Sequence, residues 1–262
     1  MHNFEFVKPS TVADAVQALA AEEAQPLSGG QTLIPSMKAR LNAPEVLVSL
    51  MGIAEMQGIR HEGDMLEVGA ATTHARVATE AAAAFPGLAG LAAQIGDPAV
   101  RNRGTLGGSL ANNDPSACYP AAALGTGAVI VTNAREIAAD DFFLGMFTTA
   151  LDEDEIITSV RFPIPQKSAY GKFLQPASRF ALTGVFVAKY ADGVRVAVTG
   201  ASENGDVRWS EAEAALASDF SAEALSGLSC PADDMIADLH GSAAYRAHLV
   251  AVMTRRAVVA AS

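Results

Sequence analysis

Short apolar runs alternate with helically spaced residues over the first fifty positions of the chain. Apolar residues recur at helical spacing after Ser10, the expected N-cap, and predict a helix. Residues 26–28 and 46–50 predict strands, separated by a glycine pair and by a short helix or turn over residues 32–41. A strand, a glycine turn, a short helix and a second strand together predict a compact βαβ-like unit.

The middle of the chain predicts short strands and helices around one long glycine-rich segment. Residues 66–69 alternate as in a strand, and two alanine-rich stretches predict helices over residues 73–84 and 88–94. Residues 95–120 follow, and because this segment is too long for a simple connector we expect a functional loop. Two further strands are expected at residues 128–132 and 156–162.

The last third of the chain has a different character, which predicts a second domain. Residues 185–190 and 194–199 flank an Ala-Asp-Gly turn and predict an antiparallel hairpin, and the remainder shows helical spacing. We therefore expect an α+β fold with a domain boundary near residues 172–178. The expected domains are residues 1–174, divided into subdomains of about 1–55 and 56–174, and residues 175–262.

Length and charge exclude several classes of protein. With 262 residues, half of them hydrophobic, the chain can bury the core of one large domain or two small ones. Its 18 Lys and Arg against 29 Asp and Glu give a net charge of −11, and nine acids against one arginine fall between residues 201 and 240. A surface this acidic repels a polyanion, so we expect no nucleic-acid partner.

Neither a transmembrane segment nor a cysteine-ligated metal centre is expected. No apolar run approaches the roughly 20 residues that a spanning helix needs. The N-terminus lacks the basic and apolar regions of a signal peptide. Cys118 and Cys230 are the two cysteines, too few to ligate an iron–sulfur cluster. We expect a cytoplasmic protein with no metal of its own.

A glycine pair, Gly29 and Gly30, follows the predicted strand at residues 26–28. Glycines at such a turn let the backbone approach a ligand closely, and successive N–H groups there form a concave site for an anion. Lys38 and Arg40 follow closely and add positive charge. A tight turn without any ligand explains this pair equally well.

A second glycine pair, Gly107 and Gly108, follows Arg101 and Arg103 and precedes a serine. Two glycine–hydroxyl loops, each with nearby cations, suit a pyrophosphate held from both sides. The alternative is a loop whose arginines pair with local acids such as Asp97. Neither loop fits the fingerprint of nicotinamide-dinucleotide sites or of ATP-binding P-loops, so FAD is the common dinucleotide that remains.

Both loops resemble the flavin motifs of the flavoprotein subunits of molybdenum hydroxylases. The first motif is SGGQTLIP at residues 28–35 and the second is RNRGTLGGSLA at residues 101–111, with shorter matches at residues 112–115 and 177–181. The chain is similar over nearly its whole length to the medium subunits of carbon monoxide dehydrogenase-type enzymes and to the flavin domain of xanthine dehydrogenase. The resemblance implies a two-subdomain FAD-binding domain of the PCMH type, followed by a C-terminal domain of antiparallel sheet plus helices.

The resemblance also implies which residues hold FAD non-covalently, and it implies no catalytic residue. Backbone N–H groups of both loops would bind the pyrophosphate, at Leu27, Ser28, Gly29, Gly30, Gln31, Thr32 and Leu33 and at Thr105, Leu106, Gly107, Gly108 and Ser109. Further implied contacts are Ile95, Ile157, Lys172 and Asp114. Tyr170 is a candidate to stack on the flavin ring, or else a strand-facing aromatic.

One implied position departs from the family pattern. Thirteen residues after Thr105, many relatives carry an acid that contacts the flavin, and here that position is Cys118. A thiol is a weak hydrogen-bond donor and carries no charge unless its pKa is depressed. Either Asp114 or a water takes over the contact, or the flavin potential differs from that of the relatives. A packing cysteine is favoured over a catalytic thiol.

The implied function is that of an electron-transfer subunit of an oxidoreductase. A large molybdopterin subunit would hydroxylate the substrate, and a small subunit with two two-iron clusters would relay electrons to FAD on this chain. From FAD the electrons would pass to an external acceptor. The implied assembly is a dimer of heterotrimers, with any membrane contact made peripherally through the complex. Two alternatives stay open: a stand-alone FAD-dependent reductase of the same superfamily, and a flavin-free scaffolding subunit.

Overall fold

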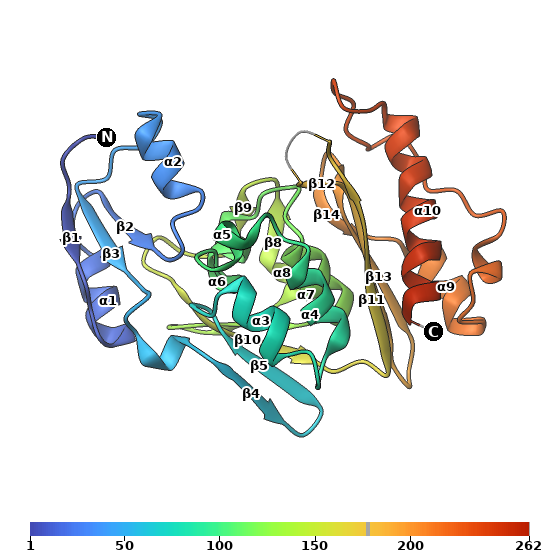
Figure 1. Ribbon diagram of the computed structural model, residues 1–262, viewed down its shortest axis with the longest axis horizontal. Coiled ribbons are helices and arrows are strands. Elements are labelled where there is room, and N and C mark those ends of the chain that lie inside the picture. The colour runs from blue at the N-terminus through green and yellow to red at the C-terminus, as the bar shows by residue number, and fades with distance from the viewer. Residues whose placement is uncertain (177–178, 262) are drawn as a thin grey trace.

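The N-terminal unit is a three-stranded parallel sheet. The computed structural model describes residues 1–176 and 179–261. The sheet has the order β1–β3–β2, and the parallel pairing of β2 with β3 confirms the expected βαβ-like unit (Figure 1). Helix α1 begins one residue later than expected, because Thr11 is the N-cap and its hydroxyl accepts a hydrogen bond from the Asp14 amide. The elements are β1 (Glu5–Val7), α1 (Val12–Leu19), β2 (Ala24–Leu27), α2 (Leu33–Lys38) and β3 (Val46–Ser49).

The central unit is a five-stranded antiparallel sheet in the order β4–β5–β10–β6–β7, with helices packed on it. Its core is made of fully buried side chains such as Phe85, Phe162 and Tyr119. The elements are η1 (Ala54–Met56), β4 (Ile59–Glu62), β5 (Met65–Gly69), α3 (His74–Glu80), α4 (Pro86–Ala93), α5 (Pro98–Arg101), α6 (Leu106–Asn112), α7 (Tyr119–Thr126), β6 (Val129–Thr132), β7 (Glu136–Ala138), α8 (Ala139–Phe142) and β10 (Ile157–Pro163), with the separate small hairpin β8 (Phe143–Gly145) and β9 (Thr148–Thr149).

The expected long loop over residues 95–120 is wrong in detail, because the segment contains the short helices α5 and α6. Each begins at a side-chain cap that satisfies a free helical amide. Asp97 accepts a hydrogen bond from Val100 N at 2.9 Å, and Thr105 accepts one from Gly108 N at 3.2 Å. The glycines of α6 are poor helix formers, so the sequence pattern conceals a helix that its cap and its packing stabilise.

The C-terminal domain is an antiparallel sheet in the order β11–β12–β13–β14, covered on its outer face by α10 (Figure 1). The pairing of β12 with β13 confirms the expected hairpin. Phe85 reaches from the central core to Phe186 on β12, with ring centroids 6.1 Å apart, so the two units share a packed boundary. The elements are β11 (Lys167–Leu174), β12 (Ala181–Lys189), β13 (Val194–Ser202), β14 (Gly205–Arg208), α9 (Ser210–Ser218), η2 (Glu223–Leu225) and α10 (Ala243–Ala261).

The change of sheet comes earlier than the expected boundary between residues 174 and 175. Strand β11 pairs with β12 from Lys167↔Lys189 to Leu174↔Ala181, so its backbone hydrogen bonds belong to the C-terminal sheet. The boundary between the sheets therefore lies between β10 and β11, near residue 165. The sequence pattern also does not predict strand β14. In the parts of the chain that are described, no helix combines the length and the apolar character needed to cross a membrane.

Candidate functional site

The two glycine loops meet in space, although they are far apart in the sequence. The hydroxyl oxygens of Ser28 and Thr105 lie 2.7 Å apart, within hydrogen-bond distance. Gly29 packs directly against the backbone of the second loop. A methyl group on Gly29 would clash with the Arg103 carbonyl and would lie 2.7 Å from Gly104 Cα. A side chain at this position would force the loops apart, so glycine is required by the close approach of two backbones.

The first loop presents free amides. The N–H groups of residues 29–32 donate to no oxygen within residues 1–176 and 179–261. Gln31 and Thr32 are exposed and Gly30 is half-buried, so the amides of these three residues are not sealed in the core, whereas Gly29 is buried. Successive unpaired N–H groups at a turn form a site for an anion such as a phosphate.

The second loop uses its amides to hold itself in place. Gly107 N donates to Ala70 O at 2.9 Å, and Leu106 N donates to Thr72 O at 3.1 Å. Gly108 N is taken by the cap of α6. The sequence predicts free amides in both loops. In the second loop, however, carbonyl groups of residues that follow β5 accept the hydrogen bonds of Leu106 N and Gly107 N. The second loop therefore packs against the first without offering these amides to a ligand, and Ser109 at its end is half-buried.

The arginines of the second motif do not form the local ion pairs that the alternative interpretation required. Arg101 donates from Nη1 to the carbonyls of Ile95 and Gly96, at 3.1 and 2.9 Å. Within the described parts of the chain, no carboxylate lies at ion-pair distance from Arg101 or from the exposed Arg103. Their positive charge is available to attract an anion.

The structure brings Ile95 and Lys172 together beside the second loop. Lys172 Nζ on β11 donates to Gln94 O at 2.9 Å, the carbonyl next to Ile95 at the end of α4. The C-terminal sheet thus contacts the segment that Arg101 also holds. Ile157 lies apart from this pair, buried on β10 opposite Thr132.

Cys118 and Tyr170 lie in the core rather than on an open surface. They are 5% and 8% exposed, and the Tyr170 hydroxyl packs against Gly184 without a hydrogen-bond partner among the described residues. Burial raises the pKa of Tyr170 well above its usual value. This placement favours the strand-facing aromatic over a ring that stacks on a ligand. Asp114 stays half-buried, and its Oδ1 accepts a hydrogen bond from Ser116 N at 2.9 Å. Ala177 and Ser178, part of a shorter matching segment, lie outside the described residues.

The sequence analysis did not identify His74, which packs against Gly104, just before the second loop. Its amide donates to Gly104 O at 2.9 Å, and its ring occupies the space that a side chain on Gly104 would need. The ring lies 5.3 Å from that of Tyr119, measured between centroids. Burial, and then the charge of Arg101, lower the pKa of His74 to about 4. A histidine after two threonines gives no sequence signal for this role.

We expect the stability of the chain to fall as the pH drops from 6.5 to 4, because of His74. Its folded pKa of about 4 lies below the ordinary value of 6.5, so protonation favours the unfolded chain in this window. At about 1.4 kcal/mol per pKa unit, the free energy of unfolding is about 2 kcal/mol lower at pH 5 than at pH 7 from this group. Urea unfolding at both pH values measures it. His74→Gln should remove the difference and the exposed-site control His61→Gln should keep it; equal pH dependence in both variants would contradict the assignment.

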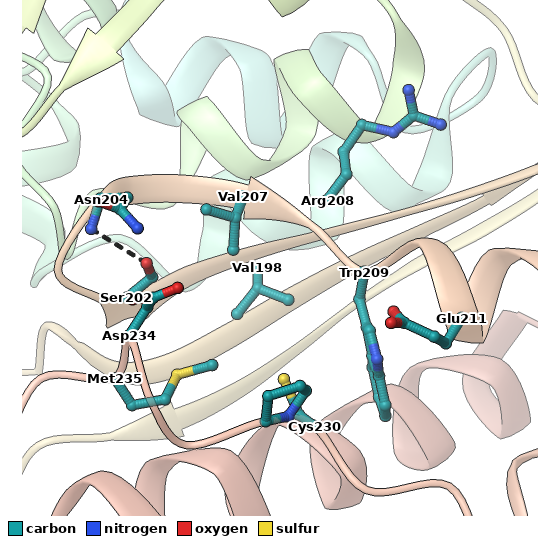
Figure 2. A pocket seen from close by; sticks show the side chains of 11 residues that line it. Val198, Ser202, Asn204, Val207, Arg208, Trp209, Glu211, Cys230, Asp234 and Met235 are labelled. Carbon is teal, nitrogen blue, oxygen red and sulfur yellow. Dashed lines mark hydrogen bonds between the residues drawn. The ribbon is translucent and has the colours of Figure 1, made fainter.

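A separate pocket in the C-terminal domain contains the second cysteine. Figure 2 shows this pocket, of about 220 Å³, between β13, β14 and the segment that carries Cys230 and Met235. Trp209 and Val198 form part of its apolar wall, and Glu211 and Asp234 carry its negative charge. None of the residues implied to hold FAD lines it. The pocket is therefore distinct from the two glycine loops.

Cys230 is expected to be a poor nucleophile at neutral pH. Burial, and then the negative charge of Glu211, raise its pKa to about 11, so the thiol stays protonated. Its alkylation by iodoacetamide, followed by peptide mass spectrometry, should be slow at pH 7.5 and should keep accelerating toward pH 11. Glu211→Gln should speed the reaction. A rate that levels off near the ordinary thiol pKa of about 8.5 would contradict this environment.

Comparisons with known proteins agree on one family. Residues 2–165 match the family described as "FAD binding domain in molybdopterin dehydrogenase". The chain is 36% identical to the nicotine 6-hydroxylase medium subunit of Paenarthrobacter nicotinovorans and 34% identical to the carbon monoxide dehydrogenase medium chain of Afipia carboxidovorans. Each alignment covers 98% of this chain and 96% of the relative. A chain of the reconstituted CO dehydrogenase from Oligotropha carboxidovorans superposes with a TM-score of 0.88 at 32% identity, covering 99% of this chain and 98% of that one.

Proposed function

The chain belongs to the family of FAD-binding domains of molybdopterin dehydrogenases, and from this premise we propose that it carries electrons through FAD within a molybdenum hydroxylase. It is a flavin-binding medium subunit of an oxidoreductase complex. The proposed step is acceptance of electrons from the two-iron clusters of a small subunit and their delivery to an external acceptor. The observation that carries the proposal is the contact of the two glycine loops, with the free amides of residues 29–32 at their junction.

The residues at this junction fit FAD. The free amides of the first loop would bind the pyrophosphate, and the unpaired charge of Arg101 and Arg103 would attract it. Ser28 and Thr105 would hold the loops at the spacing that the cofactor needs. The implied residues of both loops, from Leu27 to Leu33 and from Thr105 to Ser109, form one continuous part of the proposed site.

The remaining implied residues would contribute from the side of the C-terminal sheet. Ile95 and Lys172 are proposed to contact the flavin, since both lie beside the second loop. Asp114, Cys118, Ile157 and Tyr170 are proposed to support it from deeper in the fold, because three of the four are buried. FAD, when bound, supplies the redox chemistry, and these side chains position it and exclude water.

The partners are proposed from the same relationship. The relatives are named as medium subunits, and a large molybdopterin subunit and a small iron–sulfur subunit would complete the complex here. We propose a dimer of heterotrimers in the cytoplasm. Within residues 1–176 and 179–261, no group of three or more His, Cys, Asp or Glu side chains is placed to hold a metal ion. In this proposal the metal centres belong to the partner chains.

Two measurements test the proposal. The purified full chain is mixed with FAD, freed of excess cofactor and examined by visible absorption, which should show one flavin per chain. The native complex is then purified through a tag on this chain, and its molybdenum and iron are measured. A chain that takes up no flavin would contradict the proposed function. Flavin uptake without co-purifying molybdenum and iron would instead indicate a stand-alone reductase.

A further inference from the structure

Arg246 is a buried arginine on α10 that no flavin motif contains. Its side chain is 2% exposed. Its Nη1 donates to Leu182 O at 2.7 Å and to Gly200 O at 2.6 Å, and its Nη2 donates to Asp238 Oδ2 at 2.8 Å. A charge removed from water in this way is costly unless it is paired and hydrogen-bonded. Here two carbonyls and a carboxylate accept hydrogen bonds from Nη1 and Nη2, while the buried Nε has no hydrogen-bond partner among the described residues.

The guanidinium lies where β12 and β13 separate. The regular pairing of these strands ends at Gly184↔Thr199, so the carbonyls of Leu182 and Gly200 lie beyond the last pair. Arg246 bridges these two carbonyls. Gly200 has a φ of +79°, and a methyl group there would lie 2.6 Å from Ala181 O. Gly200 thus lies at an irregularity of β13, where the pairing with β14 shifts register between Val198 and Ser202, and Arg246 is hydrogen-bonded to this part of the strand.

The same irregular part of β13 contacts the segment that continues from the second glycine loop. Gly200 N donates to Pro115 O at 2.8 Å, and the neighbouring Thr199 hydroxyl donates to Ala117 O at 2.6 Å. Residues 115–117 connect the end of α6 to Cys118 and α7. The guanidinium therefore acts on this segment through one intervening residue, Gly200.

We propose that Arg246 is a positioning residue of the FAD site, which sets residues 114–118 and the start of β12 at a fixed spacing. This role rests on the proposed function. Stability alone does not require such a group, because apolar side chains of similar volume often replace buried ion pairs without loss. A planar guanidinium reaches two carbonyls and a carboxylate at once, whereas the point charge of a lysine does not.

The test uses the full chain with Arg246→Met, Arg246→Lys and Asp238→Asn. We expect Arg246→Met to raise the Kd for FAD about tenfold or more, with Arg246→Lys and Asp238→Asn in between. The visible absorption bands of bound FAD should shift in the same order. Hydrogen exchange of the apoprotein should quicken at the Gly200 and Ala117 amides.

Arg255→Met is the matched control, because Arg255 lies on the same helix and donates to Leu225 O, away from Leu182 and Gly200. It should lower the melting temperature but leave FAD affinity, flavin spectrum and exchange at Gly200 unchanged. If Arg246→Met does not fold, the FAD affinity and the hydrogen exchange of Asp238→Asn test the proposal in its place. Variants that lose stability yet keep wild-type FAD affinity and exchange would overturn the proposal. A wild-type chain without FAD uptake would instead overturn the proposed function, and with it this role.

Discussion

Gly29→Ala is expected to abolish tight FAD binding. The added methyl group would collide with the Arg103 carbonyl and with Gly104 Cα, both backbone atoms that have no rotamer to escape to. The loops would separate, and the contact between Ser28 and Thr105 would break. We expect the Kd for FAD to rise at least about 100-fold, equivalent to about 2.7 kcal/mol. Titration of the apoprotein with FAD, followed by fluorescence quenching, measures this change.

The matched control for this variant is Gly90→Ala. Gly90 lies inside α4, and a methyl group there would meet nothing within 4 Å. It should leave FAD affinity unchanged and stabilise the helix by about 0.5–1 kcal/mol. Circular dichroism of both apoproteins separates lost binding from lost folding. A folded Gly29→Ala chain with wild-type affinity would show that the loops do not form the site.

Glu155→Gln is expected to cause a large loss of stability without touching the loops. The Glu155 side chain is 3% exposed and accepts hydrogen bonds from Thr132 Oγ1 at 2.6 Å and from Arg135 Nε and Nη2 at 3.0 and 2.9 Å. Removing the charge weakens the hydrogen bonds that the buried carboxylate accepts, and because Arg135 itself is 47% exposed we expect a loss of about 1.5 kcal/mol in the free energy of unfolding. Urea denaturation at pH 7 measures it.

The difference in stability between wild type and Glu155→Gln should also depend on pH. The hydrogen bond from Arg135 is the main cause that lowers the pKa of Glu155 to about 2. Because the folded pKa lies below the unfolded one, the stabilisation is complete above pH 4.5 and is lost as the pH falls toward 2. The gap between wild type and Glu155→Gln should shrink over that window. Glu80→Gln, which breaks the exposed Arg76–Glu80 pair, should cost under about 0.5 kcal/mol; an equal cost for both would contradict the argument.

Local sequence patterns predict those helices and strands in which buried apolar positions recur at a regular spacing. The parallel unit and the β12–β13 hairpin follow from apolar runs bounded by glycine, and the two loops follow from glycines beside hydroxyls. The helix α6 escapes prediction because its cap Thr105 outweighs the low propensity of its glycines. The pairing of β11 depends on a partner strand, which no local pattern shows.

The candidate site was predictable only where its residues belong to a sequence motif. His74 and Arg246 act through backbone carbonyls and through packing, and such contacts leave no motif in one sequence. A charged residue inside a helix is normally expected on the solvent side, yet Arg246 is among the most deeply buried side chains of the described chain. The supporting residues could be found only once the strands that they bridge were placed.

The Thr105 hydroxyl takes part in two contacts, one local and one between distant parts of the chain. It caps α6, and it also meets Ser28, 77 residues earlier in the chain. During synthesis the first loop emerges long before the second loop against which it packs. A contact between residues so far apart in sequence forms only after the central unit has folded. If the two loops hold FAD together as proposed, cofactor capture would be a late step of maturation, because the first loop is complete before the contact with Thr105 can form.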